Sequence, residues 1–239
     1  MFKVIASGII ALTSFSAHAY TLFDYDAHYS ASLKGFTVGK IEQSLRHNGD
    51  LIVLKNEAQT SGAVSLFKDK RVKQRSSFMI GANYIKPVSY SYSDPDKYRR
   101  NVNLDFNWHE QRVSDSYSRN NIKLPQDVEV LDKLSYQVAM MRDLSKGHTS
   151  LSYLAHNGRE FKPYNLEVIA DERLKTKLGW IDTKVIKLVR DGNKKTTLLW
   201  VAPSLNYIPV KLLHDNGKGQ KVVAIITLYK ITDQKQITL

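Results

Sequence analysis

A pair of carboxylates is the first feature to look for, because two such groups can act as acid and base on a glycosidic bond. Asp94 and Asp96 form one candidate pair and flank Pro95. An Asp-Pro-Asp sequence is also typical of a solvated turn, in which the side chains hydrogen-bond the nearby backbone. We interpret the segment as a turn. An enzyme acting on envelope polysaccharide stays an alternative, and it would need paired carboxylates in a groove.

Motifs of other catalytic and metal-binding classes are missing from the sequence. It has no G-x-S-x-G, no phosphate-binding loop, no G-x-G-x-x-G and no H-E-x-x-H. It also has no cysteine, which excludes thiolate catalysis and cysteine-ligated metals. No two histidines after residue 19 lie at metal-ligand spacing on one predicted element, although a Ser-His-Asp set from distant strands stays open. We therefore expect no metal, no cofactor and no enzymatic activity. The histidines after residue 19 are His28, His47, His109, His148, His156 and His214.

Basic side chains form a candidate anion-binding surface between Lys68 and Arg75. If the end of this segment is a strand, Arg71, Lys73 and Arg75 share one face, because side chains two residues apart point the same way. That face suits a phosphate or sulfate group. The alternative is an edge strand whose charges protect it against aggregation.

Aromatic and flexible apolar residues are the candidates for an apolar ligand site. The three tryptophans lie on predicted strands, where their rings can line a cavity for an acyl chain or stack on a sugar. A methionine on the predicted helix adapts to varied apolar shapes. Ordinary core packing is the alternative for the whole set. The candidate ligand-binding residues are Trp108, Trp180, Trp200, Tyr207, Leu134 and Met141.

A period of two in hydrophobicity predicts the strands that would carry these residues. Apolar residues alternate with polar ones from Phe23 to Ala31, which places one face on a core and the other in water. Asn-Gly pairs at 48–49 and 157–158 predict hairpins, because both residues tolerate positive φ. Roughly a dozen strands joined by tight turns predict a mainly β fold, either a strongly curved antiparallel sheet or an open barrel.

One segment departs from this pattern and predicts an α-helix. Apolar residues between Leu131 and Met141 recur at spacings of three and four, which is one stripe of a helix. Asp127 is a candidate N-cap, so we predict the helix near residues 127–146. No composition break divides the chain, so residues 20–239 are predicted to form a single domain whose sheet wraps around this helix. Any interior space left by the helix would be apolar and suited to a ligand.

Residues 1–19 have the pattern of a cleaved secretory signal peptide. Lys3 precedes an apolar stretch that ends near Phe15, and residues 17–19 read Ala-His-Ala, the small-x-small pattern of a cleavage site. The apolar part is too short to span a bilayer. Because no cysteine is available to carry a lipid, we expect a periplasmic protein that is not a lipoprotein.

The chain is basic, with a formal net charge of +12. Loss of Lys3 with the signal peptide leaves 34 basic and 23 acidic side chains, a net charge of +11. Such a surface attracts anionic partners, which in an envelope are phospholipid head groups, lipopolysaccharide or acidic polysaccharide. We expect no nucleic acid as partner, because the signal-peptide pattern predicts a location outside the cytoplasm. Peripheral contact with a membrane and the oligomeric state stay open.

Several short motifs also point to a family. Residues 106–108 read Phe-Asn-Trp where the family has Phe-Asp-Trp, so one acidic residue is missing. Residues 36–39, 85–90, 132–135, 199–203 and 206–210 read FTVG, IKPVSY, DKLS, LWVAP and NYIPV. In content and order these motifs resemble the domain-of-unknown-function 3108 family of exported bacterial proteins. The resemblance covers most of the chain after residue 19. It implies an exported β-rich fold, and it implies no activity or catalytic residue.

Three functions are consistent with these features. The leading hypothesis is a periplasmic, non-catalytic binding or chaperone-like protein that holds an apolar or amphipathic envelope component, a lipid or a lipidated protein, between sheet and helix. The second is a structural or regulatory envelope protein that acts through protein–protein contacts. The third is the polysaccharide-acting enzyme described above.

Overall fold

The computed structural model describes residues 20–61, 70–81, 84–116, 120–189 and 195–238. The predicted signal peptide at 1–19 lies outside the described residues, as does the start of the basic segment at Lys68. Described strands of the first half are β1 (Thr21–Leu33), β2 (Phe36–Asn48), β3 (Leu51–Thr60), β4 (Arg71–Gly81), β5 (Tyr84–Ser93), β6 (Val102–Asn107), β7 (Arg112–Asp115) and β8 (Asn120–Lys123).

The second half adds seven strands and one α-helix to the described structure. A short 3-10 helix, η2 (Tyr98–Arg100), joins β5 to β6, and another, η3 (Pro203–Leu205), joins β13 to β14. The remaining elements are β9 (Val130–Asp132), α1 (Ser135–Ser145), β10 (Ser150–His156), β11 (Phe161–Thr176), β12 (Gly179–Val189), β13 (Thr196–Ala202), β14 (Ile208–Asp215) and β15 (Lys221–Thr238).

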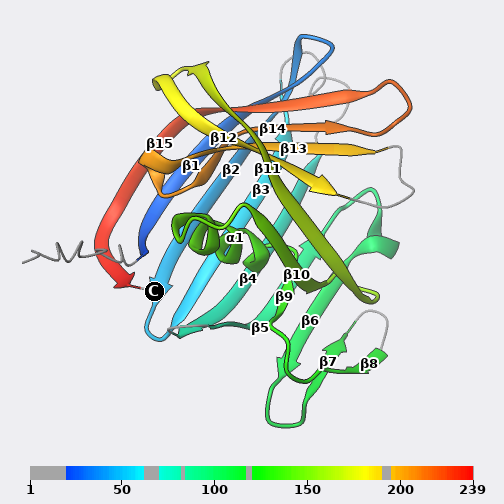
Figure 1. Cartoon of the computed structure of the whole chain (residues 1–239). Coiled ribbons are helices and arrows are strands. Elements are labelled where there is room, and N and C mark those ends of the chain that lie inside the picture. The colour runs from blue at the N-terminus through cyan, green and yellow to red at the C-terminus, as the bar shows by residue number, and fades with distance from the viewer. Residues whose placement is uncertain (1–19, 62–69, 82–83, 117–119, 190–194, 239) are drawn as a thin grey trace, which may run out of the picture.

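All described strands form one sheet, in the order β8-β7-β6-β5-β4-β3-β2-β1-β15-β14-β13-β12-β11-β10-β9. Every neighbouring pair is antiparallel except β9 with β10, which is parallel. The first and last strands, β1 and β15, pair along their length in the middle of the sheet. The sheet curves around α1 on its concave side (Figure 1). The predicted mainly β fold, a curved sheet around one helix, is therefore confirmed.

The alternation predicted for the first strand holds from Tyr25 onward but fails before it. Tyr25, Ala27 and Tyr29 face the core, as expected. Register shifts in the pairing with β15 lie on both sides of Asp24, and this β-bulge reverses the two faces. Leu22 is consequently buried, and Phe23 is not part of the buried set.

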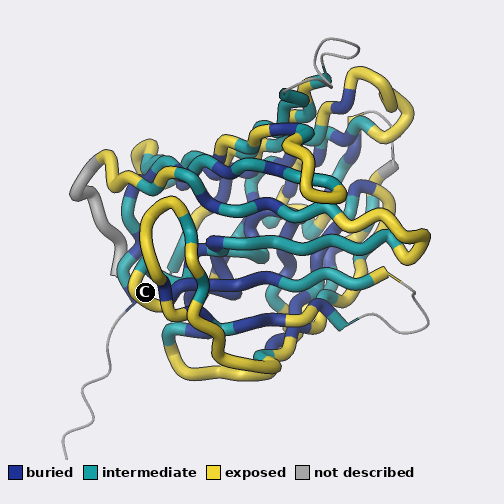
Figure 2. The backbone as a smooth tube through the Cα atoms, turned by 90° about the horizontal axis from the view of Figure 1, so that it is seen from above, coloured by how far each residue is buried: buried dark blue, intermediate teal, exposed yellow. Residues whose placement is uncertain are grey.

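The predicted helix is shorter than expected and begins at Ser135, not at Asp127. Residues 130–132 form β9, and Asp127 has a φ of +60°. The helix is also buried on more than one stripe, since Val138, Ala139 and Met140 are fully buried. These residues belong to the core cluster, so α1 is part of the core that the sheet encloses. Figure 2 shows that exposed residues gather at the turns between strands.

Asp132 caps this helix from the end of β9 and is itself fully buried. Its Oδ1 accepts hydrogen bonds from the backbone N–H groups of Leu134 (2.7 Å) and Ser135 (3.0 Å), while Ser135 Oγ accepts from the Asp132 N–H. Ser76 of β4 donates to the second carboxylate oxygen at 2.6 Å. Burial raises the pKa of Asp132, and these hydrogen bonds offset part of that effect. One side chain thus joins helix, edge strand and central sheet.

Substitutions of Asp132 test how much these hydrogen bonds contribute to stability. Asp132→Ala leaves two buried N–H groups and Ser76 without their acceptor, so we expect a loss of about 3 kcal/mol in the free energy of unfolding. Asp132→Asn keeps an oxygen for the N–H groups and should lose much less. Urea denaturation of the two variants measures the difference, and equal losses would contradict this role.

Candidate functional site

A pocket lies in a seam where the two ends of the sheet approach each other. Strand β9, at one edge, packs against β5, near the other edge, without pairing to it. One wall of the pocket is the connection from Tyr92 to Val102, and the other is the β10–β11 hairpin from Asn157 to Asn165. The pocket has a volume of about 980 Å³, which is the size of a site for a small ligand.

The pocket is strongly basic. One carboxylate, Asp115, lies among five cationic side chains that come from η2, the β9–α1 connection and the β10–β11 hairpin. Lys162 is paired with Glu160 at 2.9 Å. Arg99, Arg100 and Arg159 form no ion pair with any carboxylate of the described residues. The five cations are Arg99, Arg100, Lys133, Arg159 and Lys162.

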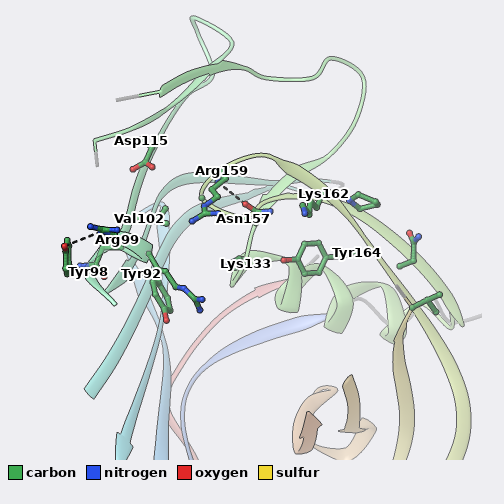
Figure 3. Close-up of a pocket in the computed structure, with 16 residues that line it drawn as sticks. Tyr92, Tyr98, Arg99, Val102, Asp115, Lys133, Asn157, Arg159, Lys162 and Tyr164 are labelled. Carbon is green, nitrogen blue, oxygen red and sulfur yellow. Dashed lines mark hydrogen bonds between the residues drawn. The ribbon is translucent and has the colours of Figure 1, made fainter. Parts of the chain in front are cut away.

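Tyrosines, asparagines, a glycine and short apolar side chains supply the rest of the lining. Figure 3 shows Tyr92, Tyr98 and Arg99 on one side, Lys162 and Tyr164 on the other, and Lys133 between them. The Tyr164 ring packs on Tyr136 of α1 with centroids 5.0 Å apart. An amphipathic anion fits such a lining, because its charge meets arginine and lysine while its apolar part meets aromatic faces.

Asp94 organises the wall that carries the two arginines of η2. It is buried, and it accepts hydrogen bonds from Lys70 at 2.9 Å and from the Asp96 backbone at 3.0 Å. Burial raises the pKa of Asp94, but these hydrogen bonds outweigh it and the pKa lies below its ordinary value. Lys70 also pairs with Asp96 at 3.5 Å. The segment is thus a turn, as predicted, in which both carboxylates are engaged by one lysine.

His156 lies behind the pocket at the end of β10. It is 1% exposed, its Nδ1 accepts a hydrogen bond from Gly158, and its ring packs edge-on against Phe161. Its Nε2 is buried without a partner among the described residues. Burial lowers the pKa of His156 to about 4, against an opposing effect of Asp115.

This histidine should make stability depend on pH. Because its folded pKa of about 4 lies below the ordinary 6.5, the unfolded chain binds a proton first as the pH falls between these values. Between pH 6.5 and pH 4, the wild-type protein should lose about 3 kcal/mol more unfolding free energy than the His156→Gln variant. Above pH 6.5, the unfolding free energies of the two proteins should change with pH in the same way. Denaturation at several pH values measures this, and parallel profiles of the two proteins would contradict it.

Comparison with known proteins places the chain in a family. The family model described as "Protein of unknown function (DUF3108)" matches residues 24–227. The chain belongs to the DUF3108 family. A solved structure titled a beta-barrel-like protein of domain of unknown function DUF1849 from Brucella abortus superposes with a TM-score of 0.61 at 10% identity. That match covers 89% of this chain and 99% of the other, and it shows the fold alone. No curated protein matches the chain significantly.

The motifs that carry the DUF3108 resemblance have architectural roles in this chain. Residues 132–135 form the helix cap described above. Residues 203–207 form the tight connection between β13 and β14, in which Asn206 and Tyr207 have φ values of +54° and +59°. Asn206 donates to the Thr21 carbonyl at 3.3 Å, and the Tyr29 hydroxyl donates to the Pro209 carbonyl at 2.9 Å. These contacts hold β1 against the C-terminal half of the sheet.

The predicted aromatic site is not assembled. Trp108 is partly buried beside Phe106 and donates to the Pro87 carbonyl at 2.7 Å. Trp200 is 5% exposed and donates to Glu172 at 2.6 Å. Tyr207 packs against the core from its turn, whereas Trp180 is 60% exposed. The four side chains therefore do not line one cavity, because they lie on different parts of a long sheet.

The predicted apolar space between sheet and helix is filled by side chains. Leu134 and Met141 are 1% and 2% exposed and belong to the central core cluster. Neither lines the pocket in the seam, whose lining includes no residue of α1. Core packing, which was the alternative interpretation, accounts for the positions of both residues.

The predicted basic face is present, but not on an edge strand. Arg71, Lys73 and Arg75 are all exposed on one face of β4, which confirms that they point the same way. β4 lies between β3 and β5, so edge protection does not explain them. Glu57 of β3 pairs with Arg71 at 3.1 Å and with Lys73 at 3.9 Å. Part of this charge is therefore already neutralised.

Sequence reasoning missed the basic residues of the seam. Arg99 and Arg100 lie three and four residues after Asp96, and Arg159 follows an Asn-Gly turn. Basic residues in loops next to tyrosines were the available signal. Among the described residues, no cluster of three or more His, Asp or Glu is suited to a metal. No helix in the described part of the chain is long and apolar enough to cross a membrane.

Proposed function

We propose that this chain is an exported, non-catalytic binding protein that holds an anionic, amphipathic lipid of the cell envelope in the seam pocket. The observation that carries the proposal is the pocket itself, in which five cations and three tyrosines surround about 980 Å³ with one carboxylate. Cationic side chains suit the phosphate of a lipid head group. The tyrosines, Val102 and Val189 suit its glycerol and the first carbons of its acyl chains.

A binding role is favoured over catalysis by what the acidic groups do. Asp94 and Asp96 share Lys70, so neither is held ready as an acid or base toward a bound molecule. Asp115 accepts a hydrogen bond from the Asn103 backbone at 3.2 Å. The proposed periplasmic location rests on the signal-peptide pattern of residues 1–19 and on the chain's net positive charge.

The direct test compares soluble short-chain lipids that differ only in charge. Dihexanoyl-phosphatidylglycerol should bind the wild-type protein in isothermal titration calorimetry, and dihexanoyl-phosphatidylcholine should bind much more weakly, because its head group has no net charge for the arginines. Mass spectrometry of protein purified from the periplasm should detect co-purified anionic lipid. Equal affinity for both lipids, or binding of neither, would contradict the proposal.

Two arginines on opposite walls should carry much of this affinity. Arg99→Ala with Arg159→Ala removes two charge-assisted contacts and should weaken phosphatidylglycerol binding roughly a hundredfold. Both side chains are exposed, so stability should change little. Arg71→Ala with Lys73→Ala is the matched control, because it removes two cations from the convex face of β4. An equal loss in the control variant would mean that net charge, and not the pocket, determines binding.

A further inference from the structure

The end of the β11–β12 hairpin extends beyond the rest of the sheet as a two-stranded ribbon. β10 pairs with β11 only up to Glu167, and β13 pairs with β12 only from Lys184. Between these points β11 and β12 pair with each other alone, from Glu172 with Thr183 to Thr176 with Gly179. The ribbon ends at the edge of the molecule (Figure 1).

One face of this ribbon belongs to the core and the other does not. On the inner face, Ile181 is buried and Leu174 packs against the core, while Glu172 accepts the hydrogen bond of Trp200. The outer face carries the cross-strand pairs Lys175 with Trp180 and Arg173 with Asp182. The inner face keeps the ribbon in place, and the outer face is left to solvent.

The tip combines exposed apolar side chains with cations. Trp180 is 60% exposed and Leu178 is 39% exposed. Arg173 and Lys175 lie 5.9 Å and 5.8 Å from the centroid of the Trp180 ring, and Lys177 is exposed in the turn. A tryptophan has no need of such exposure for packing, whereas a ring flanked by cations is typical of residues at a lipid head-group boundary.

The turn that presents these side chains is ordered by its own hydrogen bonds. Thr176 Oγ1 accepts from the Leu178 N–H at 3.0 Å and donates to the Gly179 carbonyl at 3.1 Å. Gly179 has a φ of +103°, which other residues rarely adopt. Leu178 and Trp180 are therefore held outward, and the entropy cost of ordering them on contact with a membrane is reduced.

We propose that this hairpin tip is a membrane-contacting finger that docks on an anionic phospholipid surface. Trp180 and Leu178 enter the head-group boundary, and Arg173, Lys175 and Lys177 contact lipid phosphates. Charge complementarity supports a lipid surface as the partner. The tip, residues 173–182, carries three cations and one carboxylate, Asp182, and the chain without residues 1–19 has a net charge of +11. The tip and the seam pocket lie at opposite ends of β11, roughly 40 Å apart along an extended strand, so the finger can contact lipid while the pocket stays open.

Vesicle flotation tests this surface. Wild-type protein should float with phosphatidylglycerol–phosphatidylethanolamine vesicles and stay free with phosphatidylcholine vesicles. Lys175→Glu with Lys177→Glu should lower the partition coefficient for these vesicles at least twentyfold, since each cation near an anionic surface contributes a factor of about five. Lys34→Glu with Lys218→Glu is the matched control, because it reverses two exposed charges at the turns of other hairpins.

Apolar contact is tested separately by Trp180→Ser with Leu178→Ser, against Phe36→Ser at the exposed β1–β2 turn. The tip variant should lose roughly tenfold in partitioning, and brominated lipid should quench wild-type fluorescence more than that of Trp180→Phe. The proposal would be overturned if the tip and control variants lost partitioning onto anionic vesicles equally. It would also be overturned if the wild-type protein did not bind these vesicles. Crosslinking from position 178 to a protein and not to lipid would also overturn it.

The finger and the pocket can fail independently. The Arg99→Ala, Arg159→Ala variant should still float with anionic vesicles while losing affinity for the soluble lipid. If this variant alone lost flotation, the vesicles would be bound through the pocket and the finger would be refuted. If the tip variant alone lost flotation and no soluble lipid bound, the finger would stand without the pocket function.

Discussion

The apolar concave face of an open sheet has to be covered, and the burial of α1 is what covers it. Val138, Ala139 and Met140 are fully buried between strands that are far apart in the sequence. Asp132 fixes where this helix starts, because its carboxylate accepts hydrogen bonds from the N–H groups of Leu134 and Ser135 at the helix start and from Ser76 of β4. A buried carboxylate with several hydrogen bonds is stable in place, whereas one that lost them would leave a buried charge uncompensated.

The same packing creates the candidate site. Because β9 precedes α1 and packs against β5, the edge of the sheet that carries β10 and β11 is brought toward the β5–β6 connection. Two loops that carry arginines then face each other across the seam, with Lys133 between them. The ion pairs of the buried Arg142 with the partly buried Glu129 (3.0 Å) and Asp143 (2.7 Å) fix the other end of the helix. The site is therefore a consequence of how the two ends of the open sheet are brought together.

The fold was predictable to the extent that it depends on local pattern. Alternation from Tyr25 to Ala31 and the Asn-Gly turns identified strands and hairpins correctly, because side-chain period and positive φ are local properties. The bulge beside Asp24 was not predictable, since it depends on the register with β15. The helix start was misplaced because the apolar spacing through Leu131 continues into a strand that pairs with β10.

The site was less predictable, because its parts meet only through contacts between distant strands. No spacing rule relates Arg99 to Arg159, which face each other across a seam made by β5 and β9. Alternation places Trp180 on a strand but does not show that the strand extends past its neighbours. Leu134 and Met141 were assigned to a ligand because helical spacing alone does not distinguish a lined cavity from a packed core.

A crystal structure of the protein with bound dihexanoyl-phosphatidylglycerol tests the central claim most directly. The account predicts density for the lipid phosphate in the seam, within hydrogen-bond distance of Arg99 or Arg159, with its glycerol against Tyr164. Lipid density confined to the convex face of β4, or a seam without lipid in a crystal that binds it elsewhere, would contradict the account.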